Sequence, residues 1–376
     1  MCEEEVNFPI DCANLLPMLA GALFHDQKIP DVFREPDPLV VRNNLAPLFY
    51  FYGSSVYQPY FQGSAAQVMK RDYYLSEITE RLNAEKISFR LLKGSLTADC
   101  YPAKALRPSC DIDILIRQED IETALNLFRN DGWRLSHPYL NAPGKHLPTL
   151  RKQEAALELH LALFGGGASE NKILWERLDQ GASEYDLAFL HLIYHCIIAH
   201  HFSNRWQMLV DLAVLLKSGL VNAERIAQWE QSITGENSWS SMVLNSFPEF
   251  FPETFRRKFP VTDPALSQAI RRLFWTENQT SDAEDSIWCY RNSNRHEKIV
   301  FLKKQFSKRT PAFIGARYQL SPQWSFCWYP FFCSWDLLRC AWSMSGVYFK
   351  RNSESYMKQG AARQKILRVL NKRCFE

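Results

Sequence analysis

Three short apolar runs between residues 86 and 165 constrain the fold of this chain more than any other feature. The first, 87–92, ends at a Lys-Gly-Ser sequence, and the second, 111–116, alternates polar and apolar residues. The third, 155–161, alternates in the same way. Because successive side chains of a strand point to opposite faces, this alternation predicts half-buried β-strands. We therefore expect a small sheet in this part of the chain.

Helices are predicted on both sides of these strands. Apolar residues recur at helical spacing over 38–84, a short helix is expected over 96–100, and 119–128 has an amphipathic pattern. Two strongly helical regions, 187–216 and 222–239, follow the last strand. The fold class is therefore expected to be α+β, with a small mixed sheet, flanking helices and largely helical N- and C-terminal parts.

Length and composition limit the class of protein. The 376 residues are 46% hydrophobic and 23% charged, which is typical of a globular protein and excludes disordered and collagen-like chains. At roughly 150 residues per domain, this length favours more than one domain. We predict four parts: a helical N-terminal segment, a sheet core, a helical domain, and an aromatic and basic C-terminal segment. They are expected at residues 1–85, 86–165, 166–320 and 321–376.

The C-terminal segment is unusual in its charge and aromatic content. The whole chain has a formal net charge of only +3, too small to indicate a nucleic-acid-binding protein, but residues 350–376 hold eight Lys and Arg against two Glu. The aromatic block 324–349 is interpreted as the core of a C-terminal subdomain, with an interfacial membrane patch as the alternative. The basic tail would then contact anionic lipid or RNA, although a solvated helix is the default interpretation. Asp336 and Arg339 argue against a transmembrane helix.

The start of the chain bears on its location. Glu3, Glu4 and Glu5 stand where a secretory signal would be basic, and no apolar region follows. The ten cysteines form no Cys-x-x-Cys pair, so neither a zinc ribbon nor a thioredoxin-like site is expected. We expect a cytoplasmic protein with reduced cysteines, with attachment at the inner membrane face as the alternative.

Carboxylates on the second and third predicted strands suggest a metal site. Asp111 and Asp113 are two residues apart and share one face of a strand. Adjacent carboxylates repel each other unless a cation lies between them, and Mg²⁺ or Mn²⁺ with oxygen ligands is the natural ion. Glu158, on a neighbouring strand, would complete a site for two metal ions that supports in-line attack on phosphorus.

The first strand ends in residues that suit phosphate binding. Gly94 lets backbone amides approach a phosphate closely, and Ser95 can donate a hydrogen bond to it. Lys93 and Arg107 supply positive charge near the same end. These four residues are therefore predicted to bind the phosphates of a nucleotide.

The order of these pieces resembles the DNA polymerase beta-like nucleotidyltransferase superfamily, and more closely an uncharacterised nucleotidyltransferase family within it. The resemblance covers roughly residues 40 to 220. The matching motifs are Leu92-Lys93-Gly94, Tyr101-Pro102, Arg107-Pro108, Asp111-Ile112-Asp113-Ile114 and Glu158-Leu159-His160, with counterparts of the family's helical region at His195, His200, Arg205-Trp206 and Asp211. At the third acidic position Glu158 replaces the Asp common in the wider superfamily, although Glu suits the nearer family.

The resemblance implies a polymerase-beta-like fold with Asp111 and Asp113 as metal ligands and Glu158 as the third acidic residue. It implies transfer of a nucleoside monophosphate group from an NTP to a hydroxyl or phosphate, with release of pyrophosphate. The acceptor is left open between a small metabolite such as a sugar and a macromolecule such as a protein or tRNA. His160, His195 and Asp211 are the candidate substrate contacts.

The same residues allow other interpretations. A catalytically inactive protein of this fold could bind nucleotide or act as a scaffold at a membrane-associated assembly, but a pure binder does not need three carboxylates. A glycosyltransferase using Asp-x-Asp with manganese is disfavoured, because the first 85 residues look helical. His191 and His195 lack the Glu of a helical zinc motif, which favours a packing role. His160 could be a strand histidine with its hydrogen bonds satisfied, and Arg205-Trp206 a capping salt bridge with a core Trp.

Overall fold

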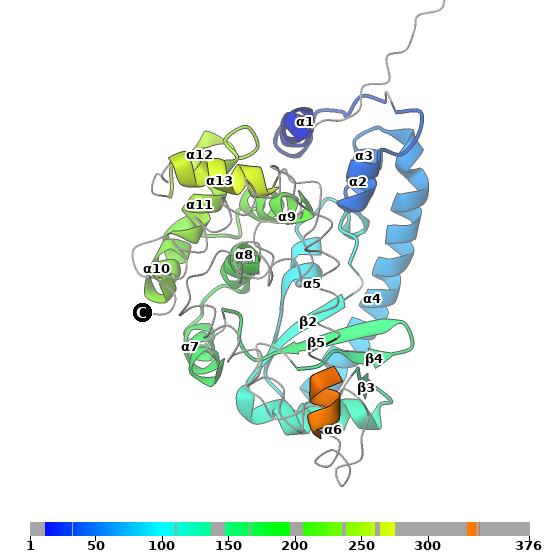
Figure 1. Ribbon diagram of the computed structural model, residues 1–376, viewed down its shortest axis with the longest axis vertical. Coiled ribbons are helices and arrows are strands. Elements are labelled where there is room, and N and C mark those ends of the chain that lie inside the picture. Colours follow the sequence, from blue (N-terminus) through cyan, green and yellow to red (C-terminus); the bar gives the residue numbers. More distant parts are fainter. Residues whose placement is uncertain are drawn as a thin grey trace, which may run out of the picture.

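In a computed structural model, the described part of the chain has an α+β fold, as predicted (Figure 1). The described residues are 12–31, 33–109, 111–136, 147–164, 167–195, 206–234, 238–259, 264–274, 329–335 and 338. A mixed sheet lies on one side of this part of the molecule, and most of the helices that follow it in sequence lie on the other.

The strands of the described residues form one sheet in the order β1-β2-β5-β4-β3. Their bounds are β1 (Phe89–Leu91), β2 (Asp111–Ile116), β3 (Arg134–Leu135), β4 (Leu150–Lys152) and β5 (Ala155–His160). The central pair, β2 and β5, is parallel, and the remaining neighbours are antiparallel. The parallel pairing brings together two strands that are about 40 residues apart in sequence, as a crossover connection requires.

The three predicted strands are confirmed as β1, β2 and β5. Strand β4, which forms a hairpin with β5, and strand β3, which pairs with β4, have no counterpart in the prediction. The turn between β4 and β5 consists of Gln153 and Glu154, and Gln153 has a φ of 53°. Two-residue hairpins usually place Asn or Gly at such a position, so this turn carries no recognisable signal.

The N-terminal part is helical, as expected. Its helices are α1 (Cys12–His25), α2 (Pro38–Arg42), α3 (Ala46–Phe51) and α4 (Gln58–Ala84). The Asp37 side chain accepts a hydrogen bond from the Leu39 backbone N–H and so caps the start of α2. Helix α4 is the longest of the described helices and runs beside the sheet (Figure 1).

Helix α6 (Ile121–Asn130) confirms the amphipathic helix expected over 119–128. Its buried positions Ile121, Leu125 and Phe128 recur at spacings of four and three, which is the apolar stripe of a helix packed on one face. The sheet therefore has α6 and part of α4 on the same side, where their apolar side chains share one core.

The two faces of β2 belong to different cores. Ile112, Ile114 and Ile116 join the core made with α4 and α6. Leu115 points the other way and joins the large helical core. Asp113 shares the Leu115 face, since side chains two residues apart on a strand point the same way. The carboxylates of β2 are therefore directed toward the helices that follow the sheet in sequence.

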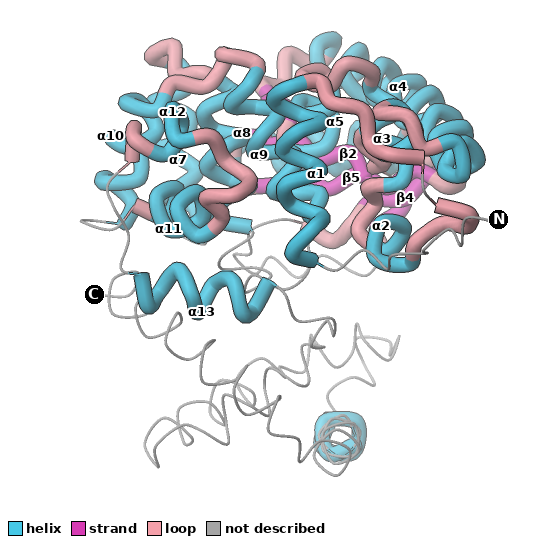
Figure 2. The backbone as a smooth tube through the Cα atoms, turned by 90° about the horizontal axis from the view of Figure 1, so that it is seen from above, coloured by secondary structure: helices cyan, strands magenta, loops and turns pink. Residues whose placement is uncertain are grey.

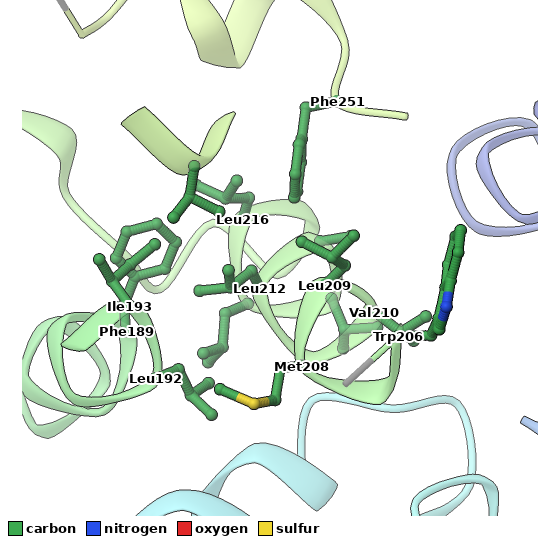
Figure 3. Packing of buried hydrophobic residues seen from close by; sticks show 14 of the residues in the cluster. Phe189, Leu192, Ile193, Trp206, Met208, Leu209, Val210, Leu212, Leu216 and Phe251 are labelled. Atoms are coloured by element: carbon green, nitrogen blue, oxygen red, sulfur yellow. The ribbon is translucent and has the colours of Figure 1, made fainter. Parts of the chain in front are cut away.

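The helices that follow the sheet in sequence are α7 (Gly167–Asp179), α8 (Glu184–Tyr194), α9 (Trp206–Lys217), α10 (Ala223–Thr234), α11 (Trp239–Ser246), α12 (Glu253–Arg256) and α13 (Pro264–Phe274). Helix α5 (Lys93–Ala98) lies between β1 and β2 in sequence and packs against β2, α8 and α9. Figure 3 shows how α8 and α9 pack through residues such as Phe189, Leu192 and Leu212. Burying each such side chain contributes about 1.5–3 kcal/mol. Helix α1 packs against α9 (Figure 2). Lys217 Nζ at the end of α9 donates to the Leu23 carbonyl of α1 at 2.6 Å.

The apolar region predicted as helical over 187–216 corresponds to α8 and α9, apart from residues 196–205, which lie outside the described part. The four-part domain division stays a prediction. Most of the aromatic block and all of the basic tail fall outside the described residues; within 329–335, which is helical, Phe331 and Trp335 are exposed. Of the helices in the described ranges, none is long and apolar enough to cross a membrane.

Candidate functional site

The parallel pair β2 and β5 places the predicted acidic residues side by side. Asp113 lies directly opposite Glu158 in the strand register, and Asp111 lies opposite Ala156. Asp113 is buried with 5% of its surface exposed, Glu158 is partly exposed, and Asp111 is exposed at the start of β2. The three carboxylates therefore run from the interior to the surface along one edge of the site.

Two neighbours engage the buried carboxylate of Asp113. Lys93 Nζ donates to its Oδ1 at 3.0 Å, and His160 Nε2 lies 2.9 Å from the same oxygen. Burial alone would raise the pKa of Asp113, but the hydrogen bond from His160 and the charge of Lys93 outweigh it and hold the pKa well below its usual range. Asp113 is therefore ionised at neutral pH.

Glu158 and His160 extend the cluster on β5. His160 Nε2 is 3.7 Å from Glu158 Oε2, and Thr149 Oγ1 donates to Glu158 Oε1 at 3.4 Å. One ligand atom from each of Asp113, Glu158 and His160 lies within 4.8 Å of the others, the spacing needed to share a metal ion. The three residues would offer a metal ion two carboxylate oxygens and one imidazole nitrogen.

The electrostatics at the site fit a divalent cation. Partial burial, followed by the negative charges of Asp113 and Glu158, raises the pKa of Asp111. The repulsion adds to the effect of burial, and a cation between the carboxylates would relieve it. Oxygen donors with excess negative charge are what Mg²⁺ and Mn²⁺ bind in proteins. Of the predicted ligands, Asp113 and Glu158 fit such an ion, and His160 is an additional nitrogen donor beside them. Asp111, exposed at the start of β2, is not one of the three residues whose ligand atoms lie within 4.8 Å of one another.

Three of the four predicted phosphate-binding residues, Lys93, Gly94 and Ser95, form the start of α5. This helix begins at Lys93 rather than at residue 96 as expected, and Lys93 has a φ of 33°, a value that is unusual for a residue with a side chain. A Cβ atom on Gly94 would lie 2.6 Å from Ser109 Oγ and 2.8 Å from Arg107 Nη1, so any other residue there would force these side chains to move. Ser95 Oγ is buried and has no hydrogen-bond partner within the described structure.

Arg107 and Asp211 form a buried ion pair behind this turn. Arg107 Nε and Nη2 donate to the two Asp211 oxygens at 2.9 and 2.8 Å, and Tyr101 Oη donates to Oδ1 at 2.7 Å. Burial would lower the pKa of Arg107, but the Asp211 charge outweighs it and raises the pKa. Asp211, predicted as a substrate contact, is 0% exposed and holds the arginine. Arg107, predicted to bind nucleotide, has its Nη1 next to Gly94.

Histidines continue the site toward α8. The His160 and His191 rings meet edge to face with centroids 5.6 Å apart, and the His191 and His195 rings do so at 5.8 Å. Burial, followed by the charge of Lys93, lowers the pKa of His191 well below its usual range, so its ring is neutral. His195 reaches the cluster through His191. His200 and Arg205 lie outside the described residues, and Trp206 is buried in the helical core.

Sequence analysis missed three contributors to this site. Thr149 donates to Glu158, and the positive charge of Arg151 on β4 acts on Asp111. Both belong to the hairpin whose turn has no recognisable signal. Tyr101 was noted only as part of a motif, and its hydrogen bond to Asp211 joins residues 110 positions apart, which no local pattern reveals.

One comparison with known proteins gave a match, to a protein family. Residues 57–234 match the family described as "Uncharacterised nucleotidyltransferase", a range that includes every predicted site residue. This match confirms the resemblance to a nucleotidyltransferase family that the motifs indicate. Searches of curated proteins and of solved structures gave no match.

Proposed function

We propose that this protein is a metal-dependent nucleotidyltransferase that moves a nucleoside monophosphate group from an NTP to an acceptor hydroxyl or phosphate and releases pyrophosphate. The observation that carries the proposal is the register of the parallel strands, which sets Asp113 opposite Glu158 with Lys93 on the same carboxylate. The match to a nucleotidyltransferase family supports the reaction class.

Each residue has a distinct task in this proposal. Asp111, Asp113 and Glu158 would hold Mg²⁺ or Mn²⁺, which supplies Lewis-acid stabilisation to phosphate oxygens. Lys93 and the Gly94-Ser95 turn would hold the β- and γ-phosphates, where negative charge grows as pyrophosphate leaves. The Ser95 hydroxyl, buried without a partner in the described structure, is suited to donate to a phosphate oxygen.

The chemical step is an in-line displacement at the α-phosphorus. The acceptor oxygen forms a bond to that phosphorus as the bond to the bridging oxygen of pyrophosphate breaks, and Glu158 takes the proton of an acceptor hydroxyl. Glu158 is suited to this because its side chain is 25% exposed, so a substrate can reach it, whereas Asp113 is nearly covered.

Calorimetric titration of the four NTPs with Mg²⁺ tests the proposal without knowledge of the acceptor. We expect at least one NTP to bind, and the Asp111→Asn/Asp113→Asn variant to lose the metal-dependent part of binding. A Glu119→Gln/Glu122→Gln variant, which removes two exposed carboxylates beside the start of α6, is the matched control and should bind as the wild type does. Failure of all four NTPs to bind the folded wild-type protein would favour the scaffold alternative.

A further inference from the structure

Within the proposed function, we infer that His160 is a direct nitrogen ligand of the catalytic ion, so that the site takes a first-row transition ion such as Mn²⁺ in preference to Mg²⁺. Three acidic residues alone would suit Mg²⁺, which prefers oxygen donors. Imidazole nitrogen is a softer donor that favours first-row transition ions. The choice of ion therefore depends on what His160 does.

The distances around His160 Nε2 match a coordination shell. In an octahedral shell with bonds of about 2.1 Å, adjacent ligand atoms are about 3.0 Å apart and opposite ones about 4.2 Å. Nε2 lies 2.9 Å from Asp113 Oδ1 and 3.7 Å from Glu158 Oε2. The first distance is that of adjacent ligands, and the second falls between the two values. Small side-chain movements would thus place all three atoms around one ion.

The surroundings also favour a ligand over an ordinary strand histidine. One acceptor is enough to satisfy the N–H of a buried histidine, yet His160 Nε2 faces carboxylates from two strands. The His160 residue is 4% exposed. When an ion binds, it takes the place of the proton between Nε2 and Asp113 Oδ1, and that proton leaves to solvent. Lys93 can stay on Oδ1, because a carboxylate oxygen has two acceptor positions.

His191 holds the His160 ring in place. Its ring packs edge to face on His160 with the two centroids 5.6 Å apart, and its Nδ1 has no hydrogen-bond partner within the described residues. The His160 ring is therefore held by packing on one side, with its Nε2 directed to the two carboxylates.

Pulsed electron paramagnetic resonance of bound Mn²⁺ tests the inference directly, because a coordinated imidazole nitrogen gives a ¹⁴N modulation that carboxylates do not give. We expect this modulation in the wild-type protein, and its replacement by a ¹⁵N pattern when only histidine is labelled. This experiment needs neither a variant nor catalytic activity. Mn²⁺ that binds without a histidine nitrogen signal would overturn the inference, leaving His160 as a hydrogen-bond partner of Asp113 and the proposed reaction intact.

Substitution then assigns the signal to one residue. His160→Gln keeps a side chain that can donate to Asp113, and we expect it to lose the nitrogen signal and to weaken Mn²⁺ binding about 10–100-fold, with Mg²⁺ binding changed less than about threefold. His25→Gln, at an exposed histidine, is the matched control and should keep both. A nitrogen signal that persists in folded His160→Gln would contradict the assignment. Absence of any Mn²⁺ or Mg²⁺ binding would instead overturn the metal-dependent function itself.

Discussion

The buried pair of Arg107 and Asp211 gives a sharp test of how the helical part supports the turn at Gly94. Asp211 is 0% exposed and accepts three hydrogen bonds, two from Arg107 and one from Tyr101. Asp211→Asn keeps the size of the side chain but leaves the Arg107 charge buried without a counterion. Removal of one partner from such a pair costs about 3–5 kcal/mol. We expect the free energy of unfolding to fall by that amount.

Urea unfolding followed by tryptophan fluorescence measures this loss. Tyr101→Phe is the graded control, since it removes one hydrogen bond to a charged group and should cost about 1.5–3 kcal/mol. The Tyr101→Phe/Arg107→Met/Asp211→Leu variant should recover most of the stability, because this apolar set buries neither a lone charge nor an unpaired hydroxyl. A loss below about 1 kcal/mol in Asp211→Asn would refute the view that this ion pair is desolvated and structurally required.

Three further predictions concern stability. Gly94→Ala should lower the free energy of unfolding by about 1–3 kcal/mol through overpacking, and should weaken NTP binding, because the new Cβ would approach Ser109 Oγ and Arg107 Nη1. Gly63→Ala is the control: this position on α4 has open space, so the substitution should be neutral or stabilising in the same unfolding assay. Asn171→Ala should cost about 2–3 kcal/mol in chemical denaturation, since Asn171 Nδ2 donates to the carbonyls of Ile116 and Leu161 at the ends of β2 and β5; an unchanged midpoint would show that water replaces it. Burial raises the pKa of Glu230 to about 7 despite hydrogen bonds from Ser238 and Ser240, so its contribution to stability is greatest below pH 4.5 and is lost as the pH rises toward 7. That loss amounts to at most about 3 kcal/mol, and Glu230→Gln should flatten the dependence between pH 5 and 8; identical slopes for the two proteins would contradict it.

Residues with local signals were predictable, and residues joined only by tertiary contacts were not. Asp111 and Asp113 could be placed on one face of a strand because alternation is visible in a single segment. The register that sets Asp113 opposite Glu158 depends on the parallel pairing of β2 and β5. These strands are not joined by a short turn, so no local sequence signal predicts the register. His160 was expected as a substrate contact, but its approach to Asp113 depends on the same register.

The start of α5 and the partner of Asp211 show the same limit. The sequence predicted a glycine turn before a short helix, but not that the helix begins at Lys93, because packing against β2 overrides the weak local preference there. Asp211 is predicted as a substrate contact, because its place in a motif cannot reveal that Arg107 and Tyr101 bind its carboxylate in the interior. Charge pairing over long separations is set by the fold rather than by local pattern.

The central claim is attack at the α-phosphorus by a site built from Asp111, Asp113 and Glu158. The most direct measurement is ³¹P NMR of an NTP incubated with the protein, a divalent ion and glycerol as a generic hydroxyl acceptor. We predict pyrophosphate together with a nucleoside monophosphate or its glycerol ester, and neither product with the Asp111→Asn/Asp113→Asn variant. Formation of a nucleoside diphosphate and inorganic phosphate, or equal pyrophosphate release by the variant, would contradict the account.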